Sequence, residues 1–290
     1  MNRQEILQVL PKRIEQIVQN EVKDWKQLQE IRIRQGQKVV LRYQGQMTEA
    51  SGQNQVVESM ECKEILSRIS QYSLYAFEEE IRKGYITIPG GHRIGIVGRA
   101  VLEQGEVKTL RHINSFNIRV CHEKIGCANR VMPYVLQEGQ FLSTLIISPP
   151  GGGKTTLLRD IVRYLSAERN VAVVDERSEI GGCYQGVPQH ELGIGCDVLD
   201  ACPKIIGMEM VLRSMAPDVI AVDEIGTRED YDTLQQALYS GCAIVATRHG
   251  EKLLSEMISP LFRRYIVLRG GNQPGEIQTI YDERGQVIWK

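Results

Sequence analysis

A glycine loop between two apolar segments is the first feature of the sequence that could do chemistry. The loop, "SPPGGGKT" at residues 148–155, follows the apolar run "TLIIS" and precedes the helical pattern "TTLLRDIVRYLSAE". It matches the phosphate-loop pattern GxxxxGK[ST] except that Ser148 replaces the first glycine. Glycines let backbone N–H groups converge on phosphate oxygens, and the following helix N-terminus adds partial positive charge. The sequence therefore predicts a nucleotide-phosphate site.

The loop residues have separate expected roles. Lys154 would bridge the outer phosphates and the Thr155 hydroxyl would bind Mg²⁺. A glycine-rich turn that only opens a helix, with Lys154 in solvent, is the alternative interpretation. The residues predicted to contact nucleotide here are Pro150, Gly151, Gly152, Gly153, Lys154, Thr155 and Thr156.

A pair of acids ends a second apolar run, "DVIAVDEIG" at residues 218–226. Ligands bind beyond the carboxyl ends of strands in open α/β sheets, which is where Asp223 and Glu224 would lie. Asp223 is predicted to hold Mg²⁺ directly or through water, and Glu224 to orient or deprotonate the attacking water. The alternative is a strand end that simply faces solvent.

A third polar strand end occurs in "AIVATRHG", residues 243–250. Thr247 and His249 would lie at the same sheet edge, where a polar group can sense the terminal phosphate. Taken by itself, His249 would be an ordinary surface or capping histidine. Its position at another strand end favours a role in the site.

The elements that must position these residues alternate between apolar strands and helical patterns, which indicates a parallel sheet covered on both faces. The tail, 275–290, predicts a hairpin about "ERGQ". The glycine-rich, aperiodic segment 181–202 predicts a long loop. The expected strands are 144–148, 170–176, 218–226, 242–250 and 264–270, and the expected helices are 155–168, 203–215 and 229–241.

The first part of the chain has a different pattern. Leu7, Leu10, Ile14 and Ile17 are at helical spacing, interrupted by Pro11. Residues 28–45 predict strand, turn and strand, 62–84 predict a helix that includes Leu74, and 85–120 predict antiparallel strands. We therefore expect an α+β domain at 1–135, followed by an α/β domain at 136–290.

Composition limits the classes of protein that fit. The 290 residues carry a net charge of -1 and 24% charged residues, so there is no overall basic field for nucleic acid or anionic lipid. No apolar run reaches the ~18 residues of a membrane helix, and the start lacks the apolar core of a signal peptide. Seven cysteines without a CxxC pair fit a cytosolic protein with reduced thiols.

The stretch 210–250 and its surroundings resemble the stage III sporulation protein AA family, which is related to the ring-forming ATPases of type II and type IV secretion and pilus retraction. Arg213, Pro217 and Asp218 match the positions before the acidic pair, and His249 matches the histidine after the sensor strand. "VAVVDERSEI" resembles the family's acidic box, with Asp175, Glu176 and Arg177 at the matching places. Glu176 is thus a second candidate for water activation; alternatively it only surrounds the magnesium ligands.

The resemblance implies a RecA-like P-loop ATPase domain that uses ATP and Mg²⁺. It also implies a cytoplasmic protein that forms a homo-oligomeric ring, expected to be a hexamer, and acts in an endospore-forming mother cell. Such a ring would lie at the membrane through a partner, the membrane-embedded complex between mother cell and forespore, and would drive or gate transport. Two departures from the related ATPases bear on nucleotide affinity: Ser148 replaces glycine, and Arg248 replaces a small or apolar residue.

Three questions stay open at the level of sequence. We hypothesise that Arg99, Arg111 or Arg119 reaches the nucleotide of a neighbouring subunit, the alternative being solvated strand arginines. A nucleotide-controlled docking module with little turnover is the second functional reading. A nucleic-acid-dependent ATPase is the third, and the charge balance and 6% aromatic content argue against it.

Overall fold

The computed structural model describes residues 3–43, 45–52, 55–73, 77–270 and 275–290. The chain forms two compact units, Met1–His122 and Glu123–Lys290. The sequence patterns placed residues 123–135 with the first part of the chain, whereas in the structure this segment groups with the second unit. Each unit has its own sheet and its own apolar core.

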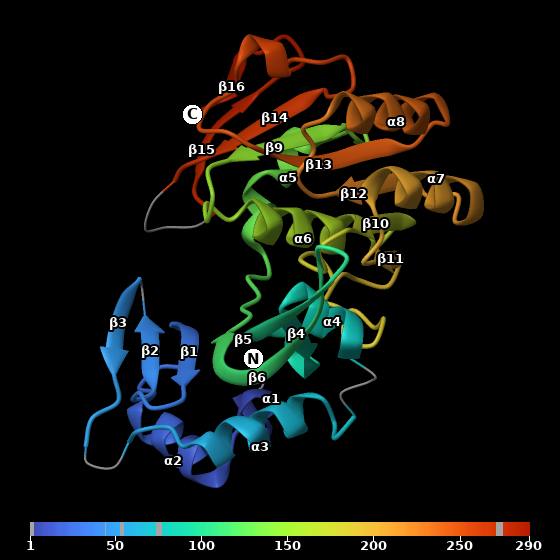
Figure 1. The fold of residues 1–290 in the computed structure, drawn as a ribbon. Helices are drawn as coiled ribbons and strands as arrows, with labels where there is room; N and C mark the ends of the chain where they lie inside the picture. Colours follow the sequence, from blue (N-terminus) through green and yellow to red (C-terminus); the bar gives the residue numbers. More distant parts are fainter. Residues whose placement is uncertain (1–2, 44, 53–54, 74–76, 271–274) are drawn as a thin grey trace. The chain divides into compact units, whose positions relative to one another are not determined.

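The first unit contains a six-stranded antiparallel sheet with the order β3-β2-β1-β6-β5-β4 (Figure 1). The predicted strand, turn and strand over residues 28–45 are confirmed as β1 and β2, which pair from Leu28↔Tyr43 to Arg32↔Val40. The strands are β1 (Leu28–Arg34), β2 (Val40–Tyr43), β3 (Gln46–Glu49), β4 (Tyr85–Ile88), β5 (His92–Glu103) and β6 (Glu106–Arg119).

Helices cover this sheet through a shared apolar core that includes Ile14, Ile31, Ile65 and Ile118. Pro11 separates the first two helices, as predicted, because it lacks the N–H that an uninterrupted helix needs. The helical pattern predicted over 62–84 is not one helix in the structure, because α3 ends at Ile69 and α4 begins at Glu78. Leu74, part of that pattern, lies outside the described residues. The helices are α1 (Arg3–Gln8), α2 (Lys12–Glu21), α3 (Ser59–Ile69) and α4 (Glu78–Lys83), with a short 3₁₀ turn η2 (Pro89–Gly91).

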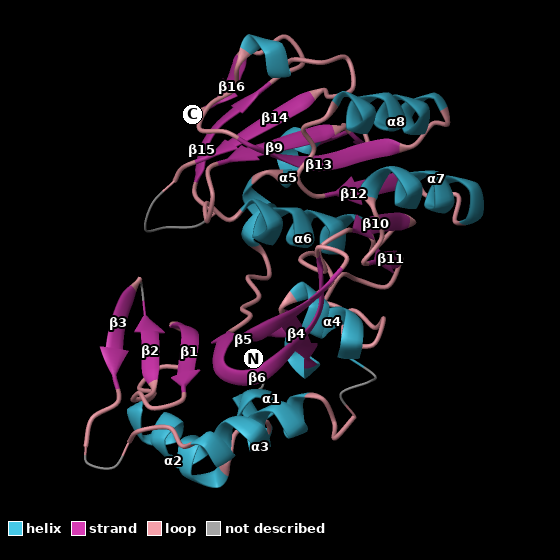
Figure 2. Cartoon of the chain, viewed as in Figure 1, coloured by secondary structure: helices cyan, strands magenta, loops and turns pink. Residues whose placement is uncertain are grey.

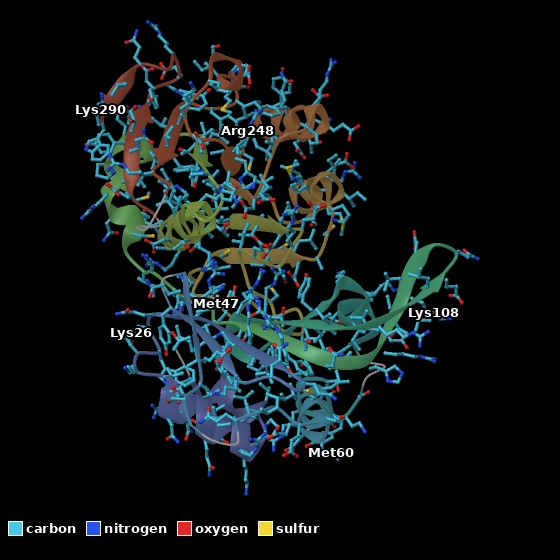
Figure 3. The ribbon with its side chains drawn as sticks, turned by 60° about the vertical axis from the view of Figure 1, so that its left-hand side comes forward. Lys26, Met47, Met60, Lys108, Arg248 and Lys290 are labelled. Carbon is cyan, nitrogen blue, oxygen red and sulfur yellow. The ribbon has the colours of Figure 1, made fainter. Side chains whose placement is uncertain are left out.

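The far end of the β5–β6 hairpin continues beyond its neighbouring strands. β4 pairs with β5 only up to Gly95, and β1 pairs with β6 only from Ser115 onward, whereas β5 and β6 stay paired to Glu103↔Glu106. Lys108 is labelled near the tip in Figure 3, where it forms a 2.7 Å ion pair with Glu103. The hairpin tip is therefore a two-stranded ribbon.

The second unit contains an eight-stranded sheet with the order β11-β10-β12-β13-β9-β14-β15-β16. The pairs from β11 to β14 are parallel, and β15 and β16 add an antiparallel hairpin at one edge, which confirms the expected hairpin of the tail. The strands are β9 (Thr144–Ser148), β10 (Val171–Asp175), β11 (Cys196–Asp200), β12 (Val219–Val222), β13 (Ala243–His249), β14 (Arg264–Leu268), β15 (Ile277–Tyr281) and β16 (Val287–Trp289).

Helices lie on both faces of this sheet (Figure 2). Alternate side chains of β9 point to opposite faces: Ile146 packs with the α6 core, and Leu145 and Ile147 pack with the core of α7 and α8. This arrangement confirms the α/β fold class. The remaining elements are η3 (Cys127–Arg130), α5 (Met132–Val135), β7 (Leu136–Gln137), β8 (Gln140–Phe141), α6 (Lys154–Leu165), α7 (Lys204–Ser214), α8 (Arg228–Tyr239) and η4 (Ser255–Met257).

The prediction of an uninterrupted loop over residues 181–202 is wrong at its end. Cys196–Asp200 forms the edge strand β11, paired in parallel with β10 from Val171↔Cys196 to Asp175↔Asp200. "CDVLD" is too short and too polar to show strand periodicity, and it becomes a strand because the exposed edge of β10 offers it hydrogen-bond partners.

Candidate active site

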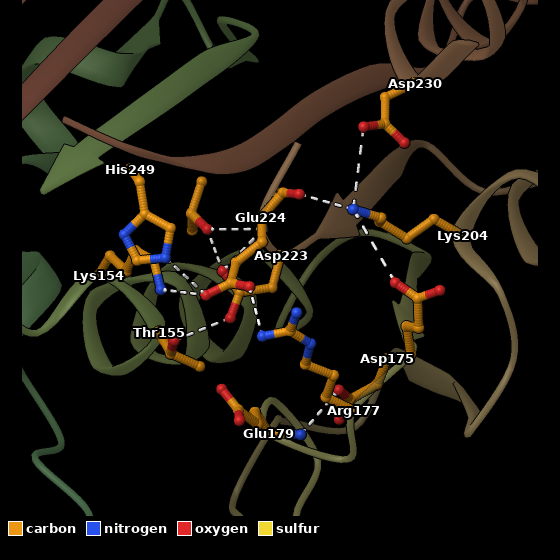
Figure 4. Close-up of polar contacts among 12 residues, drawn as sticks. Lys154, Thr155, Asp175, Arg177, Glu179, Lys204, Asp223, Glu224, Asp230 and His249 are labelled. Carbon is orange, nitrogen blue, oxygen red and sulfur yellow. Dashed lines mark hydrogen bonds and ion pairs between the residues drawn. The ribbon is translucent and has the colours of Figure 1, made fainter. Parts of the chain in front are cut away.

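The strand order brings the predicted catalytic and nucleotide-binding residues of the second unit to one edge of the sheet. β13 lies between β9 and β12, so the carboxyl ends of these three parallel strands are adjacent. Lys154 and Thr155 follow β9, Asp223 and Glu224 follow β12, and Thr247 and His249 end β13. Figure 4 shows Lys154, Thr155, Asp223, Glu224 and His249 close together. Lys154 is 70 residues from Glu224 along the chain, and Thr155 is 68 residues from Asp223.

The glycine loop turns sharply between β9 and α6. Gly151 and Gly153 have φ values of +73° and +91°, which residues with a side chain rarely adopt, and Gly153 is the N-cap of α6. A Cβ on Gly152 would lie 2.1 Å from the Ser148 hydroxyl oxygen. That hydroxyl donates to the carbonyl of Pro149 at 2.8 Å, so the serine that departs from the loop pattern is built into the turn.

Two side chains at the start of α6 reach the acidic pair. Lys154 Nζ donates to Glu224 Oε1 at 3.0 Å, and Thr155 Oγ1 donates to Asp223 Oδ2 at 2.8 Å. Lys154 is largely buried, with 11% of its side chain exposed. Pro150 and Gly151 are exposed and Thr156 is half-buried. The loop therefore presents an ammonium group and a hydroxyl to the two carboxylates.

Glu224 is surrounded by hydrogen-bond donors. Besides Lys154, its carboxylate accepts Arg177 at 2.6 Å and His249 Nε2 at 3.0 Å. Burial tends to raise the pKa of Glu224, but the Lys154 hydrogen bond and the charges of Lys154, Arg177 and His249 outweigh it, so the pKa is lowered. The carboxylate is consequently ionised at neutral pH.

The backbone of Glu224 is unusual, with φ of +55°. Its N–H donates to Thr247 Oγ1 at 2.9 Å, and the next N–H, of Ile225, donates to the Thr247 carbonyl at 2.9 Å. The Thr247 hydroxyl in turn donates to Asp223. Thr247 thus links β13 to both acidic residues.

Arg248 points away from this cluster. Its guanidinium donates to the Tyr231 hydroxyl on α8 at 2.7 Å. The departure from the related ATPases at this position is therefore used for packing between β13 and α8.

The acidic end of β10 is arranged differently. The Asp175 carboxylate is buried and accepts three backbone N–H groups, from Glu179 at 2.8 Å, Ile180 at 2.8 Å and Gly181 at 2.7 Å. Burial raises the pKa of Asp175 to about 6, against these donors, and the charge of Asp200 adds to the increase. Asp175 therefore fixes the loop that follows β10.

Glu176, the second candidate for water activation, forms an ion pair with Lys204. Its Oε2 lies 3.9 Å from Lys204 Nζ, and its side chain is 44% exposed. The structure thus places Glu176 beside Lys204, whereas the contacts of Lys154 and His249 are made by Glu224.

Two cations of the site were not given a role from the sequence, Arg177 and Lys204. Lys204 Nζ donates to the backbone carbonyl of Glu224 at 2.6 Å. One signal was available: Lys204 is the first residue of α7, where the helix dipole disfavours a positive charge. The cleft beside both cations has an empty volume of about 340 Å³, open solvent included, and is lined by Asp175, Glu176, Arg177, Glu179, Lys204, Asp223 and Glu224.

The residues at this edge fit a nucleotide with Mg²⁺. A threonine hydroxyl and a carboxylate, already 2.8 Å apart, are the hard oxygen ligands that Mg²⁺ takes in proteins. The glycine loop opens α6 at its N-terminus, where phosphate groups are stabilised. Within the described part of the chain, no group of three or more His, Cys, Asp or Glu residues forms a separate metal cluster.

Two further sequence candidates of the second unit, Arg213 and Asp218, have their contacts elsewhere in that unit. Arg213 is exposed and pairs with Glu209 at 3.5 Å, and Asp218 accepts the N–H of Asn170 at 2.9 Å at the opposite ends of the strands. Arg99, Arg111 and Arg119 are exposed in the first unit. None of the helices in the described residues has both the length and the apolar character needed to cross a bilayer.

Comparison with known proteins identifies relatives over nearly the whole chain. The family model described as "Sporulation stage III, protein AA" matches residues 1–288. Stage III sporulation protein AA of Bacillus subtilis (strain 168) is 43% identical over 310 residues, covering 98% of this chain and 96% of that protein. Protein SEEDLING PLASTID DEVELOPMENT 1 of Arabidopsis thaliana is 38% identical over 50% of this chain, which is 21% of its own length.

Solved structures show the same fold at low sequence identity. The ATPase DotB of Legionella pneumophila has a TM-score of 0.60 at 16% identity, covering 89% of this chain and 76% of its own. The pilus retraction motor PilT, solved with bound ADP, has a TM-score of 0.61 at 14% identity, covering 91% and 77%. The likeness confirms the predicted RecA-like fold of the second unit.

Proposed function

The chain belongs to the family of sporulation stage III protein AA, and we propose that it is a magnesium-dependent ATP hydrolase. One observation carries the proposal: Lys154 and Thr155 of the glycine loop lie within 3.0 Å and 2.8 Å of the carboxylates that end β12. These are the groups that phosphoryl transfer needs, namely a phosphate-binding loop, a metal-binding pair and an acid to orient water. The likeness in fold to the ATPase DotB and to the pilus retraction motor PilT supports the same assignment.

Nucleotide binding begins with the exchange of one partner. Lys154 leaves the Glu224 carboxylate and takes the outer phosphates, while the N–H groups of the loop and of the first turn of α6 surround the phosphate oxygens. Thr155 and Asp223 would hold Mg²⁺, which when bound neutralises phosphate charge. No guanine-reading pattern is evident in the sequence, so ATP is the proposed nucleotide.

Glu224 then activates the water. Once Lys154 has moved to the phosphates, the Glu224 carboxylate can accept a proton from a water that attacks the terminal phosphorus, releasing ADP and phosphate. Thr247, whose hydroxyl contacts both acidic residues, holds the pair in register with the loop. Glu176 is the second candidate for the base if Glu224 only orients the water.

We further propose that the active form is a homo-oligomeric ring, a hexamer, in which an arginine among Arg99, Arg111 and Arg119 completes a neighbour's site. All three side chains are exposed, which leaves them available for such a contact. The ring would stay in the cytoplasm and dock on a membrane-embedded sporulation complex, where hydrolysis would drive or gate transport.

A second candidate function is a nucleotide-controlled docking module that turns over little ATP. Ser148 favours it, because this residue replaces the first glycine of the loop pattern, a departure that bears on nucleotide affinity. The two functions differ in turnover at saturating ATP.

The test is ATP turnover of the purified protein as a function of its concentration, with its mass in solution measured alongside. Turnover per subunit that rises with assembly supports the ring hydrolase. ATP binding without turnover at any concentration, with or without the membrane partner, supports the docking module. Turnover stimulated by single-stranded nucleic acid would instead revive the nucleic-acid-dependent ATPase.

A further inference from the structure

We propose that Lys204 is a positioning residue that holds the backbone of Glu224 in the conformation from which its carboxylate reaches the glycine loop. The inference rests on the proposed hydrolase function for its kinetic consequence, and on the geometry of the site for its structural one. Lys204 does not touch the carboxylate of Glu224; it acts through the carbonyl of the same residue.

The contact is short and shielded. Lys204 Nζ donates to the Glu224 carbonyl at 2.6 Å, and only 15% of the lysine side chain is exposed. A hydrogen bond from a charged donor is stronger than one between neutral groups, and low exposure reduces competition from water. The carbonyl of Glu224 is therefore held firmly by the first residue of α7.

Glu224 needs such support because its backbone conformation is strained. A non-glycine residue at φ +55° persists only where the surroundings fix it. Thr247 binds the N–H groups of Glu224 and Ile225, each at 2.9 Å, and Lys204 binds the carbonyl between them. Two elements, β13 and α7, thus both hold the turn.

The position of Lys204 in the sequence also calls for an explanation. A positive charge on the first residue of a helix is opposed by the helix dipole. Glu176 and Asp230 offset it, each with a carboxylate oxygen 3.9 Å from Nζ. Figure 4 shows Nζ between the Glu224 carbonyl and the Asp230 carboxylate. Lys204 could therefore serve instead to balance the charges of Asp230 and Glu176, and an experiment must separate this role from the positioning of Glu224.

Lys204→Met keeps the length of the side chain and removes the donor. We expect turnover to fall about 10²-fold with KM unchanged, because a displaced catalytic group lowers the rate while Lys154, Thr155 and Asp223 still bind nucleotide. Lys204→Arg, which keeps a donor, should recover part of the turnover. Lys290→Met at the exposed C-terminus is the matched control and should leave turnover unchanged.

A crystal structure of Lys204→Met supplies a readout that does not depend on activity. The expected result is a Glu224 φ that leaves the left-handed region and a carboxylate that loses Lys154. If the Glu224 carboxylate keeps its contact with Lys154 and φ of Glu224 stays near +55°, the inference is overturned, whether or not the wild type hydrolyses ATP. Absence of turnover in the wild type, in contrast, counts against the proposed function alone.

Asp230→Asn separates positioning from charge balance. The two N–H groups that donate to Asp230, from Gly226 and Thr227, both bind Oδ2, and an amide oxygen can accept them as well. If Lys204 serves only to balance charge, Asp230→Asn should restore turnover to the Lys204→Met protein. The positioning role predicts that the double variant stays as slow as Lys204→Met.

Discussion

Two acidic strand ends lie side by side in the second unit, and they are satisfied in different ways. Asp175, at the end of β10, accepts three backbone N–H groups of the loop that follows it. Glu224, just beyond β12, accepts the side chains of Lys154, Arg177 and His249. The Asp175 carboxylate is thus bound by backbone groups, and the Glu224 carboxylate is bound by side chains that can change partners.

The difference indicates that Asp175 has a structural role and that Glu224 is available for catalysis. Backbone donors cannot move without unfolding the loop, so Asp175 stabilises the position of residues 179–181. Side chains can change partners, so Lys154 can pass from Glu224 to a phosphate and expose an ionised base.

Replacing Glu224, the proposed catalytic acidic residue, should have the largest effect on turnover. Glu224→Gln keeps the size of the side chain and removes its basicity, so turnover should fall ~10²–10⁴-fold while ATP binding is retained. Single-turnover kinetics and titration calorimetry measure the two quantities. Glu256→Gln, at an exposed position, is the control. Unchanged turnover in Glu224→Gln would move the base role to Glu176.

Removing Lys154, the partner that can move from Glu224 to phosphate, should have the next largest effect. Lys154→Ala deletes the charge expected on the outer phosphates, so ATP affinity should fall by about 10²–10³-fold. Equilibrium binding of a fluorescent ATP analogue measures it, with the exposed Lys252→Ala as control. Affinity equal to that of the wild type would mean that Lys154 serves only its ion pair with Glu224.

The structural acid should instead affect stability and its pH dependence. Asp175→Asn places an amide where three N–H groups donate, which should cost ~1–3 kcal/mol of unfolding free energy. Because the folded pKa of Asp175 is raised to about 6, its ionisation should lower wild-type stability, by at most about 3 kcal/mol, as pH rises from ~4 to ~6. The variant should lack this slope.

Glu224 should show the opposite slope. Its folded pKa is lowered, so its contribution to stability is present above the unfolded pKa and is lost as pH falls through the folded value. Urea unfolding followed by Trp289 fluorescence, in a Trp25→Phe background, reports on the second unit alone. Slopes of equal sign for Asp175→Asn and Glu224→Gln, each relative to the wild type, would remove the contrast between the two strand ends.

The smallest expected effect concerns the most exposed partner of Glu224. Arg177 has 64% of its side chain in solvent, so Arg177→Gln should change unfolding free energy by no more than about 1 kcal/mol. Thermal unfolding measures this change. A loss of turnover far beyond it would indicate that Arg177 contacts phosphate in the nucleotide complex.

The sequence by itself determined the parts of the site that depend on local spacing. The glycines, Lys154 and Thr155 are neighbours in the chain, and a strand, a turn and a helix are enough to aim them. The apolar runs before Asp223 and Thr247 likewise predict buried strands whose ends are polar. Local pattern therefore gave the α/β architecture and the candidate acids.

Tertiary structure decided which of these residues meet. The order β12-β13-β9 brings Thr247 to Asp223, sheet pairing makes a strand of Cys196–Asp200, and packing of α7 brings Lys204 to the Glu224 carbonyl. The left-handed backbone of Glu224 depends on donors and acceptors from two other elements. Such contacts join residues 20 or more positions apart, so no spacing along the chain encodes them.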